Sequence, residues 1–128
     1  MDILLDTCTF LWITTGSKQL SATARRAFQN PGNTVYLSSV STWEILVKNG
    51  LGRLALPGPP IDYVKVQREN HGITSLALSE AAVLHEPRLP KHHTDPFDRM
   101  LLCQALEHGC TILTPDEEIA KYPVRVIW

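Results

Sequence analysis

The sequence predicts an α/β protein folded as a three-layer sandwich, in which helices flank a five-stranded parallel sheet. Short apolar segments alternate with segments of helical periodicity along the chain. Most of the apolar segments do not alternate with polar residues, which is typical of strands buried on both faces of a parallel sheet. Neither a repeat nor a linker divides the 128 residues, so we expect a single domain over 1–128.

The expected elements follow from local signals. Short, apolar and β-branched segments predict strands at 2–6, 34–39, 73–78, 110–114 and 124–128. Helical periodicity predicts helices at 21–28, 41–49, 61–70, 79–86 and 96–108, with a helical turn or two at 115–122. Ser21 is a favoured N-cap, Pro96 suits a first helical position, and Gly50 and Gly109 follow helix ends.

Composition and charge limit the class of protein. A hydrophobic fraction of 44% and a charged fraction of 20% are typical of a soluble globular chain. The net charge of -1 creates no global basic field, so nucleic acid would have to bind a local patch. The N-terminus lacks the basic region of a signal peptide, and no apolar run approaches the roughly 18 residues of a membrane span. Three cysteines without a CxxC pair indicate buried, reduced thiols in a cytoplasmic protein.

Five acidic residues fall where strands give way to helices or where helices begin: Asp6, Glu44, Asp95, Asp98 and Asp116. Asp6 ends the first expected strand, and Asp116 follows the fourth. Right-handed crossovers place the carboxyl ends of parallel strands at one edge of a sheet, which is where ligands bind in open α/β folds. We therefore expect most of these acids to converge on that edge.

Helix capping is a separate explanation for each acid. Ser41 and Glu44 fit a capping box. Asp95 fits an N-cap before a proline, with Asp98 facing the positive end of the helix. Asp116 fits another cap-like start, and Asp6 would cap a helix beginning at Cys8. Capping and ligand binding are compatible, because a helix end fixes the direction of a side chain.

Capping alone does not explain why the acids would converge. Three or four carboxylates in one small cleft repel one another, and a divalent cation relieves that repulsion. Ligands that are all oxygen suit Mg²⁺ or Mn²⁺. Such ions generate a nucleophile from water and stabilise a phosphorus centre during in-line displacement. The pattern therefore indicates phosphodiester hydrolysis.

Three stretches carry a resemblance to a known family: "LLDTCTFLW", "SSVSTWEILVKNGLGRLALP" and "LPKHHTDPFDRMLLCQALEHGCTILTPDEEIAKYPVRVIW". Together they cover most of the chain, and they resemble PIN-domain ribonucleases, especially the VapC-type toxins of bacterial toxin–antitoxin pairs. The resemblance implies a PIN-like fold and Mg²⁺- or Mn²⁺-dependent endonucleolytic cleavage of RNA. It also implies a homodimer and a small cognate antitoxin whose tail enters the acidic site.

The resemblance also implies roles for individual residues. The family's four acids match Asp6, Glu44, Asp98 and Asp116, which would hold the metal and the attacking water. Thr7 matches a residue that supports the first acid, and Asp95 is interpreted as a cap beside the metal ligands. The chain departs from the family at Pro115, where related chains often carry an arginine.

Basic and aromatic residues are weaker candidates for substrate contacts. Phosphate contacts are expected from basic residues near the acidic segments, and the candidates are Lys48, Arg53, Lys91 and Arg99. Ordinary solvated charge is the alternative for each, and Lys48 also has the spacing to pair with Glu44. His92 and His93 are interpreted as loop residues near the substrate path, since no ligand set for zinc is complete. Trp12, Trp43 and Trp128 are expected in core or dimer packing rather than in base stacking.

Rival enzyme functions require residues or spacings that this chain lacks. A haloacid-dehalogenase-type phosphatase needs an acid two residues after Asp6, where Cys8 stands. A catalytic thiol at Cys8 is disfavoured because no histidine is near it in the sequence. A receiver domain needs an aspartate after the third strand and a lysine after the fifth, and the chain shows neither. The remaining alternative is a catalytically inactive module with the same fold that binds RNA or a partner protein.

Overall fold

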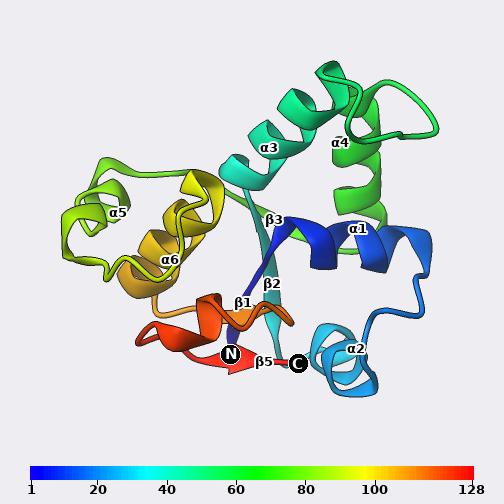
Figure 1. The fold of residues 1–128 in the computed structure, drawn as a ribbon. Coiled ribbons are helices and arrows are strands. Elements are labelled where there is room, and N and C mark those ends of the chain that lie inside the picture. Colours follow the sequence, from blue (N-terminus) through cyan, green and yellow to red (C-terminus); the bar gives the residue numbers. More distant parts are fainter.

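The five strands form one parallel sheet in the order β3-β2-β1-β4-β5 (Figure 1). The computed structural model describes all of residues 1–128. The strands are β1 Asp2–Leu5, β2 Thr34–Ser38, β3 Thr74–Leu76, β4 Thr111–Leu113 and β5 Val126–Ile127. The helices are α1 Thr7–Thr15, α2 Ala22–Gln29, α3 Ser39–Gly50, α4 Pro60–Asn70, α5 Glu80–Val83 and α6 Pro96–His108, with 3-10 turns η1 Glu86–Arg88 and η2 Ile119–Lys121.

Two apolar cores lie on opposite faces of this sheet. On β1, Ile3 and Leu5 face one core and Leu4 faces the other, as the two-residue period of a strand requires. The first core is covered by α1, α2 and α4. The second is covered by α6, against which α5 packs, on the other side of the sheet (Figure 1). The prediction of a three-layer α/β sandwich with a five-stranded parallel sheet is therefore confirmed.

The serine that caps α3 is not the one that the capping-box pattern indicated. Ser38 is both the last residue of β2 and the N-cap, and its hydroxyl accepts from the amide of Val40 at 3.0 Å. Ser41 lies inside the helix, so the predicted capping box with Glu44 is wrong. Since α3 begins directly at the strand end, Glu44 lies in the second turn rather than the first.

Smaller differences occur where short elements meet prolines or polar turns. The helix expected at 79–86 consists of α5 and the 3-10 turn η1, which contains Pro87. The turns expected at 115–122 contain only the 3-10 turn η2. The helix after β1 begins at Thr7, one residue before the expected start, and Asp6 is its N-cap as expected. No helix combines the length and the apolar character that crossing a membrane would require.

Candidate metal centre

A cleft of about 260 Å³ opens at the carboxyl edge of the sheet. All five predicted acids line it, and they come from segments far apart in the sequence. The lining residues are Asp6, Thr7, Cys8, Trp12, Glu44, Lys48, Asp95, Asp98, Pro115 and Asp116. The predicted convergence is therefore observed, and it includes all five acids rather than most of them.

Asp6 stands where the central strand β1 meets α1, and it is 7% exposed. One carboxylate oxygen accepts from the amide of Thr9 at 2.8 Å, so the side chain caps α1. The hydroxyl of Thr114, at the end of β4, donates to the other oxygen. Burial raises the pKa of Asp6 above its ordinary value, and these hydrogen bonds oppose that rise. Asp6 is thus a desolvated carboxyl held from two sides.

Glu44 reaches the cleft from the second turn of α3 and is also buried. The hydroxyl of Thr7 donates to Glu44 Oε1 at 2.6 Å and lies 3.0 Å from the hydroxyl of Ser41. Lys48, one turn further along α3, pairs with the other oxygen, and this contact raises the pKa of Lys48. Thr7 therefore contacts Glu44, and not Asp6 as the sequence-based interpretation had it.

The start of α6 supplies two acids with different surroundings. Asp95 is the N-cap, and its Oδ1 accepts from the amide of Phe97 at 2.8 Å, with Pro96 in the first helical position. Asp98 lies in the first turn, largely buried, and its pKa is raised to about 7. Desolvation is the main cause and the charge of Asp95 adds to it, while His93 acts in the opposite direction. The cap expected at Asp95 is present.

Asp116 is fixed in the loop after β4 by its own backbone contacts. Its amide donates to the hydroxyl of Thr114 at 3.1 Å, and its Oδ1 accepts from the amide of Glu118 at 2.8 Å. The remaining oxygen, Oδ2, lies 3.2 Å from Nε2 of His93. Thr114 therefore contacts both Asp6 and Asp116, which links the first acid in the chain to the last.

His93 is part of this site, although the sequence analysis treated it as a loop residue near the substrate path. Its Nε2 also lies 3.0 Å from Oδ2 of Asp98. One ligand-type atom from each of His93, Asp98 and Asp116 falls within 4.8 Å of the others. The only sequence signal was a histidine two residues before Asp95, and it gave no indication of contact with Asp116, which is 23 positions away.

A family profile described as "PIN domain" matches residues 3–124. The chain belongs to the PIN domain family. Proteins of this family are generally nucleases that depend on a divalent metal, which agrees with an acidic cleft and supports a hydrolase activity. No curated protein sequence is significantly similar to the chain.

Solved structures share this PIN fold over nearly the whole chain. VapBC2 from Rickettsia felis, bound to a DNA fragment from their promoter, contains a chain that matches with a TM-score of 0.73 and 13% identity, covering 98% of this chain and 97% of that one. VapBC from Salmonella typhimurium, also bound to DNA, matches with a TM-score of 0.71 and 17% identity over 98% and 96%. VapBC-1 from nontypeable Haemophilus influenzae matches with a TM-score of 0.69 and 20% identity over 98% and 96%. The fold is therefore VapC-like.

The donor atoms of this PIN domain fit a hard divalent cation. The cleft presents carboxylate oxygens from five acids, of which Asp6 and Glu44 are buried. Lys48 is the only lysine or arginine in the lining, so little positive charge balances them. Crowded carboxylates with raised pKa values, as at Asp6 and Asp98, are stabilised when a cation replaces the missing charge. The residues present can therefore hold Mg²⁺ or Mn²⁺.

The four basic candidates are placed very differently around the PIN site. Lys48 lines the cleft, whereas Arg53 and Lys91 are exposed and lie outside its lining. Arg99 forms a two-pronged ion pair with Glu86, and its NH1 donates to the carbonyl of Pro90. The guanidinium is thus occupied within the protein, which favours a structural role over the phosphate contact that the sequence suggested.

One cysteine and one tryptophan are more exposed than core packing would make them. Cys103 and Cys110 are buried as expected, but Cys8 is exposed and lines the cleft. Burial of part of its surface and the charges of nearby acids raise the pKa of the Cys8 thiol, which makes it a poorer nucleophile. Trp43 is 58% exposed and so lies outside the core of this chain, with its ring edge-on to Phe97. Of the two kinds of packing expected for it, packing in a dimer stays a prediction.

Proposed function

We propose that this protein is a divalent-metal-dependent endoribonuclease and the toxin of a toxin–antitoxin pair. The observation that carries the proposal is the meeting of four acids from β1, α3, α6 and the β4 loop in one cleft. The resemblance to VapC-type toxins supplies the substrate class and the biological role. We also propose that residues 1–128 form one domain, that the protein works in the cytoplasm, and that it forms a homodimer.

In the proposed reaction the ion would be held by Asp6, Glu44, Asp98 and Asp116, and Mg²⁺ or Mn²⁺ bound there would supply an activated water and stabilise charge on the phosphate. Residues of the chain itself orient the carboxylates and contact the substrate. Thr114 orients Asp6, and Thr7 orients Glu44, so the carboxylates keep their directions before a metal arrives. Lys48 offers a cation at the cleft for an RNA phosphate.

Asp116 and Glu117 form a matched pair for testing this function. Purified protein free of any antitoxin is incubated with total cellular RNA in Mg²⁺, in Mn²⁺ and in EDTA. We expect discrete fragments that require metal and disappear in Asp116→Asn, with the rate falling by about 100-fold or more. Glu117 is the neighbouring residue and is exposed, so Glu117→Gln should cleave like the wild type.

Either of two results would contradict the proposal. Cleavage that persists in EDTA, or that survives in Asp116→Asn, would separate the activity from the acidic cleft. A folded protein that cuts no RNA with either metal would favour the alternative of an inactive module that binds RNA or a partner protein. Mapping of the fragment ends would identify the RNA that is cut.

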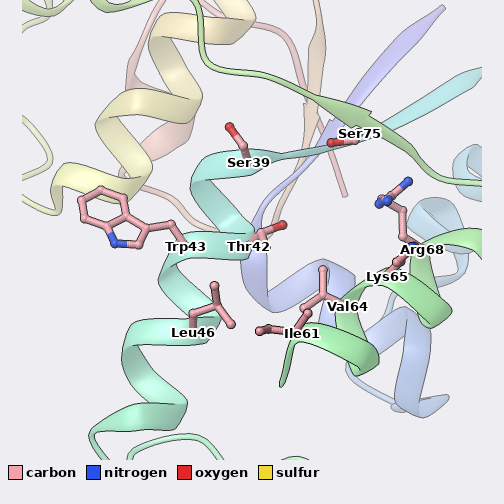
Figure 2. A pocket seen from close by; sticks show the side chains of 9 residues that line it. All are labelled: Ser39, Thr42, Trp43, Leu46, Ile61, Val64, Lys65, Arg68 and Ser75. Atoms are coloured by element: carbon pink, nitrogen blue, oxygen red, sulfur yellow. The ribbon is translucent and has the colours of Figure 1, made fainter. Parts of the chain in front are cut away.

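A second hollow, separate from the acidic cleft, supports the antitoxin proposal. It is a groove of about 360 Å³ between α3 and α4, which Figure 2 shows from close by. Trp43, Leu46, Ile61 and Val64 give it an apolar surface. Trp43 and Ile61 are 58% and 71% exposed and lie in one groove, and adjoining exposed apolar side chains are typical of interaction sites.

Charge indicates what kind of segment fits this groove. Lys65 and Arg68 line it, neither forms a salt bridge, and no acidic residue is among the lining. A helix with apolar side chains on one face and an acidic residue beside them would complement both features. We propose that the antitoxin binds here through such a segment.

The groove proposal is tested with a coexpressed candidate antitoxin. We expect Ile61→Asp to weaken the purified complex by about 10-fold or more, because a buried unpaired carboxylate would face the partner's apolar side chains. Leu84 is similarly exposed, at 65%, but is the C-cap of α5, so Leu84→Asp is the matched control and should bind normally. Equal loss in both variants, measured by isothermal titration calorimetry, would exclude this groove as the binding site.

A further inference from the structure

The two ring nitrogens of His93 face different partners. Nδ1 accepts a hydrogen bond from the backbone amide of Asp95 at 3.2 Å. Nε2 points toward two of the carboxylates, 3.2 Å from Oδ2 of Asp116 and 3.0 Å from Oδ2 of Asp98. The side chain is only 15% exposed, so water cannot readily replace these contacts.

The backbone contact determines which nitrogen carries the proton. An amide N–H only donates, so Nδ1 must present a lone pair to Asp95. In neutral imidazole the proton then lies on Nε2, where it is directed at the carboxylate of Asp116. The hydrogen-bond geometry therefore makes His93 a donor toward the acids.

The loop that carries His93 is held by its own set of contacts. The amide of His93 donates to the hydroxyl of Tyr122 at 2.8 Å, and its carbonyl accepts from Arg99 NH1 at 3.1 Å. The Tyr122 hydroxyl in turn donates to the carbonyl of Pro90 at 2.7 Å. Arg99 is anchored by Glu86, so this network fixes the position of the ring relative to α6.

From this geometry we infer that His93 is a positioning residue that stays protonated on Nε2 and is not a ligand of the metal. Its N–H holds the loop carboxylate of Asp116 beside the helix carboxylate of Asp98. The inference deepens the proposed function and rests on it, because it assumes that these acids bind a divalent ion.

Ligation of a metal through Nε2 would require the other tautomer. The proton would then have to move to Nδ1, where it would face the amide proton of Asp95. That change would break a hydrogen bond at the start of α6, next to the cap made by Asp95. If Nε2 instead donates to the carboxylates, the hydrogen bond from the Asp95 amide is kept. The surroundings of the ring therefore favour the donor role.

Two substitutions separate the roles of the two ring nitrogens. The amide nitrogen of glutamine takes the place of Nε2–H, whereas the amide oxygen of asparagine takes the place of Nδ1. If His93 works by donating to the carboxylates, His93→Gln keeps the metal site and His93→Asn does not. If its role is only to accept from Asp95 and shape the loop, His93→Asn keeps the metal site and His93→Gln does not.

The first readout is Mn²⁺ affinity, measured by isothermal titration calorimetry without RNA. We expect His93→Asn to bind Mn²⁺ about 10-fold more weakly, which is the size of effect seen when residues that orient metal ligands are lost. His93→Gln should bind like the wild type. Equal losses in both variants, a larger loss in His93→Gln, or a wild type without measurable Mn²⁺ affinity would overturn the inference.

The second readout is the tautomer itself. Protein with ¹⁵N-labelled histidine is examined by NMR before and after saturation with diamagnetic Mg²⁺. The proposal expects His93 to show a protonated Nε2 in both states, and a shift of the proton to Nδ1 on adding Mg²⁺ would overturn it. Neither readout uses RNA, so a metal-binding protein that cuts no RNA would refute the proposed function and leave this inference standing.

Discussion

Asp98 shows at the scale of one residue how the site is arranged. Its carboxyl is desolvated, close to Asp95, and its pKa rises to about 7. A carboxyl whose pKa is raised by folding prefers to be protonated in the native state. In the metal-free protein the contribution of this group to stability is therefore fully present below about pH 3.8. It is lost as the pH rises through the folded pKa of about 7. A carboxylate at this position therefore lowers the stability of the metal-free protein at neutral and higher pH.

Asp98→Asn should therefore stabilise the metal-free protein at about pH 8, by about 2–4 kcal/mol in the free energy of unfolding. Asparagine has nearly the same shape and carries no charge to desolvate. The gain should shrink as the pH falls from about 7 toward the ordinary carboxyl value of 3.8, where the native aspartate is already protonated. Urea unfolding in EDTA across this range measures it. Glu117→Gln is the control, and a gain that does not change with pH would contradict the explanation.

The contacts of His93 could not be predicted from the sequence. Acids at strand ends could be assigned because the rule for parallel sheets places every strand end on one edge. His93 lies in an irregular loop, and its contact with Asp116 depends on how Arg99 and Tyr122 fix that loop. No periodicity encodes such a contact, so the histidine was assigned to the substrate path instead of to the acids.

At the scale of elements, α6 combines a cap and a candidate metal ligand within its first turn. Asp95 accepts from the amide of Phe97, and Asp98 follows three residues later, facing the cleft. The helix start therefore gives the second acid a fixed direction. The "DPFD" pattern is compatible with both capping and metal binding, which is why the two could not be separated by sequence alone.

Asp95→Ala should lower the free energy of unfolding by about 1 kcal/mol, because the N-cap contact is lost. Asp95→Asn should keep nearly all of the stability, since asparagine is an equally favoured cap, and it should still cleave RNA. Thermal unfolding of the two variants beside the wild type measures the first expectation. Cleavage by Asp98→Asn at the wild-type rate, with Asp95→Asn inactive, would reverse the roles given to the two acids.

The elements themselves were predictable wherever a strong local signal stood alone. Ser21, Pro96 and Gly109 mark helix ends as expected. Three serines near the end of β2 are candidate N-caps. The S-x-x-E pattern predicted Ser41, whereas α3 begins directly at the strand end and Ser38 is the N-cap. Trp43 was assigned to packing because its neighbours are apolar, but the side of α3 that carries it borders the groove. Sequence patterns identify the helix more reliably than the direction in which each side chain points.

At the scale of the whole molecule, the order of the sheet explains why distant residues share one cleft. β1 lies between β2 and β4, so the ends of the first and fourth strands are neighbours. Asp6, Thr114 and Asp116 meet for that reason, across more than a hundred positions. The fold class and the edge of the sheet that carries the site could thus be predicted, whereas the hydrogen bonds that orient the acids could not.

Mn²⁺ should stabilise the whole native molecule, because only the folded chain brings the four carboxylates together. At a concentration of about 100 times the dissociation constant, the gain in free energy of unfolding should be about 2.7 kcal/mol. Differential scanning calorimetry with and without Mn²⁺ measures it as a rise in melting temperature. Asp6→Asn should show little of this rise. An equal rise in that variant would place the bound ion elsewhere.

The pairing of β1 with β4 also bears on how the chain is made in the cell. A ribosome synthesises Asp6 more than a hundred residues before it reaches residues 111–116. Until then β1 lacks one neighbour, and Asp6 lacks both the hydroxyl of Thr114 and the carboxylate of Asp116. A nascent chain therefore has no complete site until residues 111–116 have been made. Under the proposed function, the order of the strands delays nuclease activity until β4 and the loop after it have been synthesised.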